Sequence, residues 1–338
     1  MTWEVIVPRA WLRQRGAHMV AAEEHMIDPT ARTPIHPFDA DTRVAAVAEH
    51  TWAATITDRW NTVGGRAFGG YSLAVCLQAL RLELPLPDPL TAAALFLGPV
   101  RPGPATVSTE VARIGRRVAA GHARLVQSGV EVVHAMATFT DLRSATGRTL
   151  IRNRMPDLPP PGQAIELRTS IAGVTVTDRI EYRLAQPPGW SQGRPSGAPT
   201  MTLWLRFRQP RDPDLLALAM LVDAAPPAVF ELGETGSTTI ELTVHLRGHP
   251  APGWLACRAT TRHVIGGYHE EDFEIWDSHG KLVAQSRQLA LLPATAHELR
   301  RDAPSSHEHG EHGRRGGTAP SGAVHRSVRS RHAAAWLA

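Results

Sequence analysis

Two stretches of the chain repeat the same order of elements, and this duplication restricts the possible folds more than any other feature. In each stretch, a hydrophobic helical segment is followed by several long segments in which apolar and polar residues alternate. The first set contains a helical segment at 69–84 and strand-like segments at 90–100, 103–117, 119–129 and 130–142. The second set contains a helical segment at 213–230 and strand-like segments at 237–248, 253–267, 268–280 and 281–292. A repeat at a spacing of about 150 residues predicts two copies of one helix-plus-antiparallel-sheet unit.

Turn signals fall at equivalent places in the two copies. The segment VRPGPATVSTEVARI aligns with HPAPGWLACRATTRHV, and LVQSGVEVVHAMA aligns with IWDSHGKLVAQSRQ. Within the second pair, QSG and DSHG predict hairpin turns. Two Pro-rich stretches, at 155–162 and 186–200, separate the copies. We therefore expect a first domain at 36–150, a Pro-rich linker region at 151–200 and a second domain at 201–295.

The two ends of the chain are expected to be disordered. They comprise an N-terminal extension at 1–35 and a tail at 296–338 that is rich in His and Arg. The tail has too few apolar residues to offset the entropy cost of ordering. It brings His307, His309 and His312 close together in sequence, which we interpret as part of a solvated tail and not as a metal site.

The positive charge of the chain is concentrated in the tail. The formal net charge is +4 and the pI is about 9.6, but residues 36–295 contribute only +1. Because binding to a phosphate backbone needs clustered charge on the folded surface, nucleic acid is not an expected partner.

The sequence also limits the expected location of the protein. It contains no run of about 18 apolar residues and no secretory signal pattern, so we expect a cytoplasmic protein without a membrane span. Cys76 and Cys257 each lie in an apolar stretch and are predicted to be buried free thiols.

The ordered set of motifs resembles a known family. WNTVGGRAFGGYSLAVCLQAL, the strands that follow it, and the segments STTIELTVHLRG and GKLVAQSRQLALL are similar to the acyl-CoA thioesterases typified by bacterial thioesterase II. The resemblance covers residues 36–293. It implies an α+β double hotdog fold, in which two copies of a long helix are each wrapped by a curved antiparallel β-sheet. It also implies a thioester hydrolase of lipid or fatty acid metabolism, with acyl-CoA as substrate and a homodimer as the assembly.

The resemblance implies an active site as well. In that family, an Asp, a hydroxyl residue and a Gln hold the water that attacks the thioester. By motif these are Asp223 in LVDAAPP, Thr239 in TTIEL and Gln288 in VAQSRQLALL. The first copy has no carboxylate in its helix between Gly70 and Leu82 and has Ala137 where the second has Gln288, so one site per chain is implied.

Each of these positions has an alternative explanation. Ionised acids are seldom buried without a partner, so the position of Asp223 in an apolar run needs an explanation. The alternative to a catalytic role is an acid at the end of the helix that forms hydrogen bonds with the local backbone. Thr238 replaces Thr239 if the alignment slips by one residue. Gln285 is the competing amide for Gln288.

Strand alternation assigns a face to two of the candidates. Thr239 is predicted to share a face with Glu241, Thr243 and His245. Gln288 is predicted to share a face with the small residues Ala284, Ser286 and Ala290.

Gly69 and Gly70, which begin the first helix, are candidate substrate-binding residues. Glycines at a helix N-terminus let the pantetheine or phosphate of a ligand approach the backbone, although a tight turn with close packing explains them equally well. Neither a cofactor nor a metal is expected. We interpret His263, His269 and His279 as solvated residues at strand ends.

Two other functions fit the same fold. One is a non-catalytic module that binds acyl-CoA or an acyl lipid. The other is a hydratase or dehydratase of the hotdog type, which pairs an Asp or another acid with a His. Neither helical segment contains a His, which disfavours the second function. A serine nucleophile is not indicated, because the sequence lacks a GxSxG motif.

Overall fold

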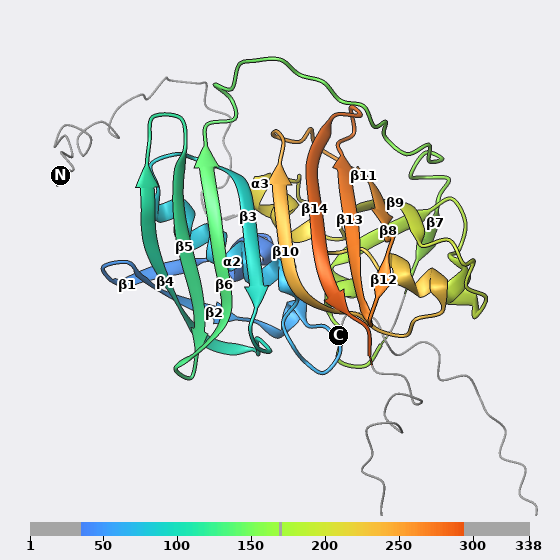
Figure 1. Cartoon of the computed structure of the whole chain (residues 1–338), viewed down its shortest axis with the longest axis horizontal. Helices are drawn as coiled ribbons and strands as arrows, with labels where there is room; N and C mark the ends of the chain where they lie inside the picture. Colours follow the sequence, from blue (N-terminus) through green and yellow to red (C-terminus); the bar gives the residue numbers. More distant parts are fainter. Residues whose placement is uncertain (1–34, 169–170, 294–338) are drawn as a thin grey trace, which may run out of the picture. The chain divides into compact units, whose positions relative to one another are not determined.

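The computed structural model describes residues 35–168 and 171–293, whose strands form one antiparallel sheet (Figure 1). The first repeat contributes β1 (Val44–Ala48), β2 (Thr51–Ile56), β3 (Asp88–Phe96), β4 (Gly103–Ile114), β5 (Ala119–Gln127) and β6 (Val130–Thr140). The rest of the chain contributes β7 (Ile165–Leu167), β8 (Ile180–Leu184), β9 (Thr200–Phe207), β10 (Thr238–Leu246), β11 (Leu255–Thr260), β12 (Val264–Ile265), β13 (Tyr268–Trp276) and β14 (Leu282–Leu291). The strand order is β1-β2-β4-β5-β6-β3-β10-β14-β13-β11-β9-β8-β7, and β12 pairs with β13.

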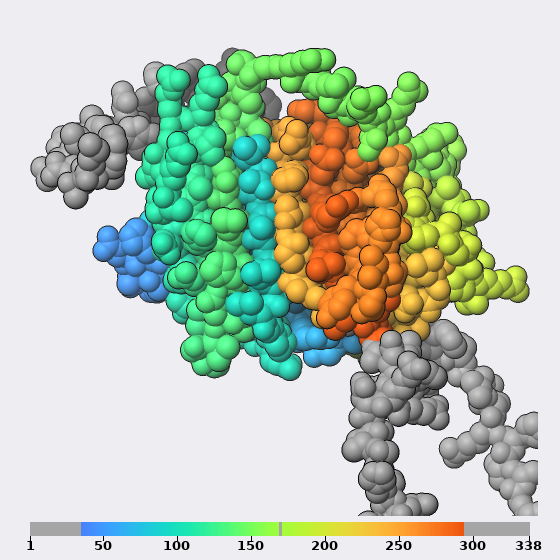
Figure 2. All heavy atoms as spheres, in the orientation of Figure 1, coloured from blue at the N-terminus to red at the C-terminus, as the bar shows by residue number. Residues whose placement is uncertain are grey.

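The two repeats meet inside this sheet, where β3 pairs with β10. Leu95 on β3 lies opposite Glu241 on β10, and Ala93 lies opposite Thr243. Figure 2 shows the two strands side by side along the junction. Because backbone hydrogen bonds fix the register across this junction, residues from both repeats can contribute to a single site.

Helix α2 (Gly69–Glu83) lies against the strands of the first repeat and is enclosed on most sides. It contacts β3, β4, β5 and β6 of the sheet and the helix of the second repeat. Ten of its 15 residues are buried, so its apolar surface is not confined to a single stripe. A helix of this kind is stable only when other elements surround it.

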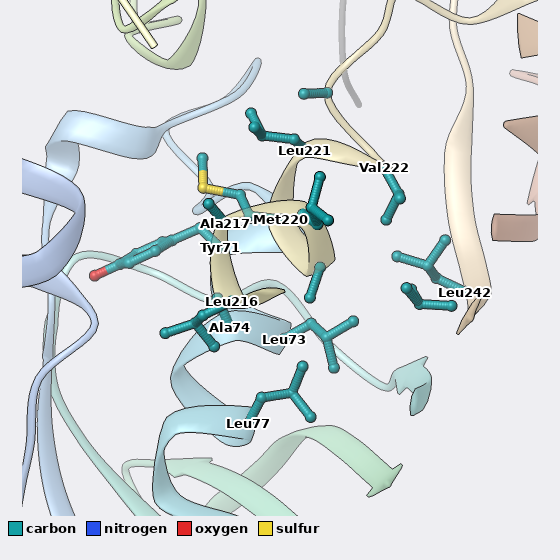
Figure 3. Packing of buried hydrophobic residues seen from close by; sticks show 14 of the residues in the cluster. Tyr71, Leu73, Ala74, Leu77, Leu216, Ala217, Met220, Leu221, Val222 and Leu242 are labelled. Carbon is teal, nitrogen blue, oxygen red and sulfur yellow. The ribbon is translucent and has the colours of Figure 1, made fainter. Parts of the chain in front are cut away.

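The second repeat contributes helix α3 (Leu215–Leu221), which packs against α2. Figure 3 shows Leu73 and Leu77 of α2 in one buried cluster with Leu216 of α3 and Leu242 of β10. The hydrophobic core is therefore shared between the repeats.

Helix α3 is much shorter than the sequence analysis predicted, since only seven residues of the expected 213–230 form an α-helix. It begins after Asp214, whose side chain accepts a hydrogen bond from the backbone N–H of Ala217. It cannot continue through Pro226 and Pro227, because proline lacks an N–H and restricts the residue before it. A 3₁₀ helix (Ala228–Leu232) follows. The prediction of two long helices is therefore wrong, and Asp223 lies in the turn after α3.

The expected linker region, 151–200, contains two strands of the sheet. β8 pairs with β9, and β7 pairs with β8. Ile180, Tyr182 and Leu184 on β8 are buried, so this region adds core to the second repeat. The division into domains at the predicted boundaries remains a prediction. The two expected disordered ends, including the three tail histidines, lie outside the described residues, apart from Ile35.

Besides the 3₁₀ helix after α3, four short helical elements of the described residues lie outside the two main helices. A short helix, α1 (Pro37–Asp41), precedes β1, and 3₁₀ turns span Asp58–Trp60, Val176–Asp178 and Gly189–Gln192. Cys76 and Cys257 are buried and free, as predicted. Among the helices of the described residues, none has the length and apolar character required for a membrane span.

Candidate active site

A cavity of about 260 Å³ opens where the two repeats meet. It is bounded by the start of α2, the end of β3 and the turn after α3. The start of β10 and the C-terminal part of β14 complete its wall. Four of the five predicted site residues line it, namely Gly69, Asp223, Thr239 and Gln288. Phe68, Phe96 and Val100 add apolar surface, and Arg66 is the one cationic residue among the lining residues.

Asp223 is held by the first turn of α2. Its Oδ2 accepts a hydrogen bond from the backbone N–H of Gly70 over 2.8 Å. The residue before it is also fixed, because Ser286 on β14 donates its hydroxyl to the carbonyl oxygen of Val222 over 3.2 Å. The predicted substrate-binding residue Gly70 is therefore bonded to Asp223, and it does not line the cavity.

Close approach of the two helices requires glycine at position 70. A Cβ atom there would lie 2.4 Å from the carbonyl oxygen of Met220 on α3. At Gly69 a Cβ atom would lie 3.0 Å from both Asp223 Oδ2 and the ring of Phe96. The packing interpretation of these glycines thus holds for Gly70, whereas Gly69 also borders the cavity.

The carboxyl group of Asp223 has an unusual acidity for an aspartate. Burial raises its pKa to about 7, and the hydrogen bond from Gly70 only partly opposes this effect. A helix N-terminus favours an anion, but here the loss of solvation is larger. An acid that titrates near neutral pH is well suited to proton transfer.

Thr239 and Gln288 form a hydrogen-bonded pair across β10 and β14. The hydroxyl of Thr239 donates to Gln288 Oε1 over 2.7 Å. A β-bulge in β10 makes this contact possible, since Thr239 pairs with Ala290 and Glu241 pairs with Leu289, which leaves Ile240 as the extra residue. A bulge changes the side to which neighbouring side chains point.

The prediction that Thr239 shares a face with Glu241 is therefore wrong. The prediction that Gln288 shares a face with small residues of the same strand is confirmed. Regular alternation placed Thr239 with Glu241, but the bulge puts it on the buried side with Ala290. Gln288 shares that side with the buried residues Ala284, Ser286 and Ala290.

The structure also separates the alternatives to these two residues. Thr238 lines the cavity and remains a second hydroxyl there, but the bond to Gln288 is made by Thr239. Gln285 lies on the opposite face of β14, where it donates to Glu274 over 3.4 Å, and it does not line the cavity.

Two polar residues on β13 are buried, of which Glu271 was missed by the sequence analysis and His269 was assigned to the solvated surface. Glu271 bonds to Gln288, and His269 Nε2 lies 2.9 Å from the hydroxyl of Ser237, which lines the cavity. The expectation that His269 is solvated is wrong, because only 1% of it is exposed, and this burial lowers its pKa. Alternation with Phe273 in YHEEDFEIW would have placed both residues on the buried face.

Glu271 shares the electrostatic environment of Asp223. The pKa of Glu271 is raised to about 7, mainly by burial and also by the nearby carboxylate of Asp223, while hydrogen bonds from Ala228 and Gln288 act in the opposite direction. Since the influence of two like charges is mutual, each carboxyl group makes ionisation of the other harder.

The described residues offer no alternative site based on a metal. Within 35–168 and 171–293, no group of three or more His, Cys, Asp or Glu side chains is arranged to hold a metal ion.

Comparison with known proteins supports a family assignment. Residues 56–140 match the acyl-CoA thioesterase N-terminal domain, and residues 153–292 match the acyl-CoA thioesterase C-terminal domain. An uncharacterized protein of Mycobacterium tuberculosis, Rv0499, is 29% identical over 292 residues, which cover 78% of this chain and 98% of that protein.

Solved structures agree with this result. A Thermobifida fusca protein provisionally assigned to thioesterase II matches with a TM-score of 0.71 and 29% identity, covering 77% of this chain and 99% of that one. A protein of unknown function with the hot dog fold from Alicyclobacillus acidocaldarius matches with a TM-score of 0.70, 24% identity and coverage of 77% and 99%. With both domain models matched in order, the chain belongs to the acyl-CoA thioesterase family and is a thioester hydrolase with the hot dog fold.

Proposed function

We propose that the chain hydrolyses acyl-CoA thioesters with a water molecule that Asp223 activates and that Thr239 and Gln288 help to hold. One observation carries the proposal. A carboxyl group with a pKa of about 7 lines the same cavity as a hydrogen-bonded hydroxyl and amide. This set provides a base and two further polar groups around a cavity of about 260 Å³.

In the proposed reaction, the water oxygen attacks the thioester carbonyl carbon while Asp223 takes a proton from the water. The tetrahedral intermediate then collapses, the C–S bond breaks, and the proton on Asp223 passes to the sulfur of CoA. Water and the thioester are consumed, and a free carboxylic acid and the CoA thiol are formed. The raised pKa suits both steps, because the same group must accept a proton and then release it.

The carbonyl oxygen of the substrate becomes negative during the attack, and a hydrogen-bond donor is needed there. We assign this position to the N-terminus of α2, where Gly69 lines the cavity. Gly69 is the first residue of α2, so its backbone N–H lies at the positive end of the helix dipole. The dipole therefore strengthens the attraction of this N–H for a developing anion.

Release of CoA thiol from a panel of acyl-CoAs, followed with a thiol-reactive dye, tests this function. We expect steady turnover by the wild type and a loss of at least about 100-fold in Asp223→Asn, which keeps the shape of the side chain but removes the base. Asp212→Asn is the matched control, because Asp212 is exposed and lies outside the cavity.

The same panel distinguishes the competing functions. Saturable binding of acyl-CoA without thiol release would contradict hydrolysis and favour a non-catalytic binding module. Thiol release that Asp223→Asn leaves unchanged would retain the thioesterase activity but reject the assignment of Asp223 as the base.

A further inference from the structure

Glu271 is a buried carboxyl group next to the proposed site, and the reaction described above does not use it. It lies on β13 directly opposite Gln288 on β14 and is 5% exposed. Its Oε2 accepts a hydrogen bond from the backbone N–H of Ala228 over 2.6 Å. Its Oε1 accepts one from Gln288 Nε2 over 3.2 Å. Glu271 does not line the cavity, so it can act on substrate only through its neighbour.

These contacts fix the orientation of the Gln288 side chain. Above pH 7, where Glu271 is mostly ionised, its carboxylate only accepts hydrogen bonds, so the end of the amide that faces Glu271 must then be the NH₂ group. The opposite end, Oε1, then faces Thr239 and accepts the proton of its hydroxyl. A hydroxyl has a single proton, so Thr239 retains only lone pairs for a molecule in the cavity.

We infer that Glu271 is a positioning residue, which sets the direction of the hydrogen bonds in the chain Ala228–Glu271–Gln288–Thr239. The inference rests on the proposed function, since it explains how these residues would hold the water. With this direction, Thr239, Gln288 Oε1 and an ionised Asp223 all present acceptors. The water then donates both of its hydrogens to the protein and keeps a lone pair for attack on the thioester.

Glu271→Gln tests the inference with almost no change in shape. The backbone N–H of Ala228 cannot turn, so the introduced amide must point its oxygen toward it and its NH₂ group toward Gln288. Gln288 then rotates, its NH₂ group faces Thr239, and the hydroxyl proton turns toward the cavity. A water molecule in the cavity would then accept the proton of the Thr239 hydroxyl through one of its own lone pairs. That lone pair would no longer be free to attack the thioester.

We expect kcat of Glu271→Gln to fall at least about tenfold, with KM changed by less than about twofold and Tm by no more than about 3 °C. A residue that only supported the fold would instead change Tm and leave kcat per folded molecule unaltered. Glu274→Gln is the matched control, because Glu274 lies on the same strand and is hydrogen-bonded on the opposite face. We expect it to keep wild-type kcat.

The exchange variant Glu271→Gln/Gln288→Glu provides a second test that is independent of how well the single variant folds. It restores the hydrogen bond that Thr239 donates to residue 288, although the bond between positions 271 and 288 runs the other way. Ala228 donates to the amide oxygen at 271, the NH₂ group of that amide donates to the carboxylate at 288, and Thr239 donates to the same carboxylate. We expect its kcat to exceed that of Gln288→Glu alone, in which two carboxylates face each other. Wild-type kcat in Glu271→Gln, or no gain in the exchange variant, would overturn the inference. A wild type that releases no thiol would instead reject the proposed function.

Discussion

Asp223 Oδ2 lies 2.8 Å from the backbone nitrogen of Gly70, so the carboxyl group of the second repeat is bound at the helix N-terminus of the first. Neither repeat contains both partners of this contact. The duplicated chain is therefore required for the candidate site and not only for stability. Because the first repeat has no carboxylate at the equivalent place in its helix, the arrangement is formed once per chain.

Asp223→Asn is expected to stabilise the fold at alkaline pH while it abolishes activity. Burial raises the pKa of Asp223 from its ordinary 3.8 to about 7. Above pH 7 the folded protein must keep an ionised carboxylate in a poorly solvated position, whereas the same carboxylate is solvated by water in the unfolded chain. A shift of about three pKa units corresponds to roughly 4 kcal/mol at most, and we expect a gain of roughly 2–4 kcal/mol at pH 8 from urea unfolding.

The pH dependence of that gain gives the control. Between pH 4 and 7 the unfolded chain binds fewer protons at this residue than the folded chain, so the wild-type free energy of unfolding falls as pH rises. The advantage of Asp223→Asn should therefore disappear toward pH 4. An advantage that is constant from pH 4 to 8 would show that the variant acts by another route.

Activity should increase with pH across neutrality. Asp223 accepts a proton only when it is ionised, and its pKa is raised to about 7 by burial. We expect kcat/KM to rise between pH 6 and 8 and to reach a plateau above that range. Glu271 titrates in the same range, so the midpoints belong to the pair of carboxyl groups. Initial rates on an acyl-CoA without an ionisable acyl group, corrected for uncatalysed hydrolysis, provide the measurement. A flat profile from pH 5 to 9 would contradict a carboxylate base with this acidity.

The hydroxyl of Thr239, and not its shape, is expected to matter. Thr239→Val keeps the β-branched side chain but removes the donor to Gln288 Oε1, so kcat should fall about 10- to 100-fold. Thr239→Ser keeps the hydroxyl and should stay within about threefold of the wild type. The rate of thiol release by Thr239→Val and Thr239→Ser shows whether the hydroxyl or the shape of the side chain matters. Equal rates for the two variants would instead favour Thr238 as the functional hydroxyl.

Gly70→Ala is expected to disrupt both the fold and the site. The added Cβ atom would lie 2.4 Å from the carbonyl oxygen of Met220, so α2 and α3 must move apart. We expect a loss of about 2–3 kcal/mol in the free energy of unfolding and a lower kcat as Asp223 loses its anchor. Gly162→Ala is the control, because a Cβ atom there meets nothing within 4 Å. Comparable unfolding curves for the two variants would show that the helices tolerate the separation.

Much of the fold could be predicted from periodicity. The strands at 103–117, 119–129, 130–142, 237–248 and 281–292 appear as β4, β5, β6, β10 and β14, since alternation with turn residues marks half-buried strands. The length of the second helix could not be predicted from its apolar run, because an apolar stretch remains buried whether or not it is helical. The pair Pro226-Pro227 limits the length of this helix, and it indicates the end of the helix better than the hydrophobicity of the run does.

The sequence by itself determined the duplicated unit and the buried strands, and its resemblance to a known family identified three polar residues that line one cavity. The tertiary structure alone decided which of their atoms meet. The bulge in β10 turns Thr239 toward Gln288, the pairing of β13 with β14 puts Glu271 behind that amide, and the contact of α2 with α3 brings Gly70 to Asp223. Such contacts depend on register and on the approach of elements distant in sequence, which one-dimensional periodicity does not encode.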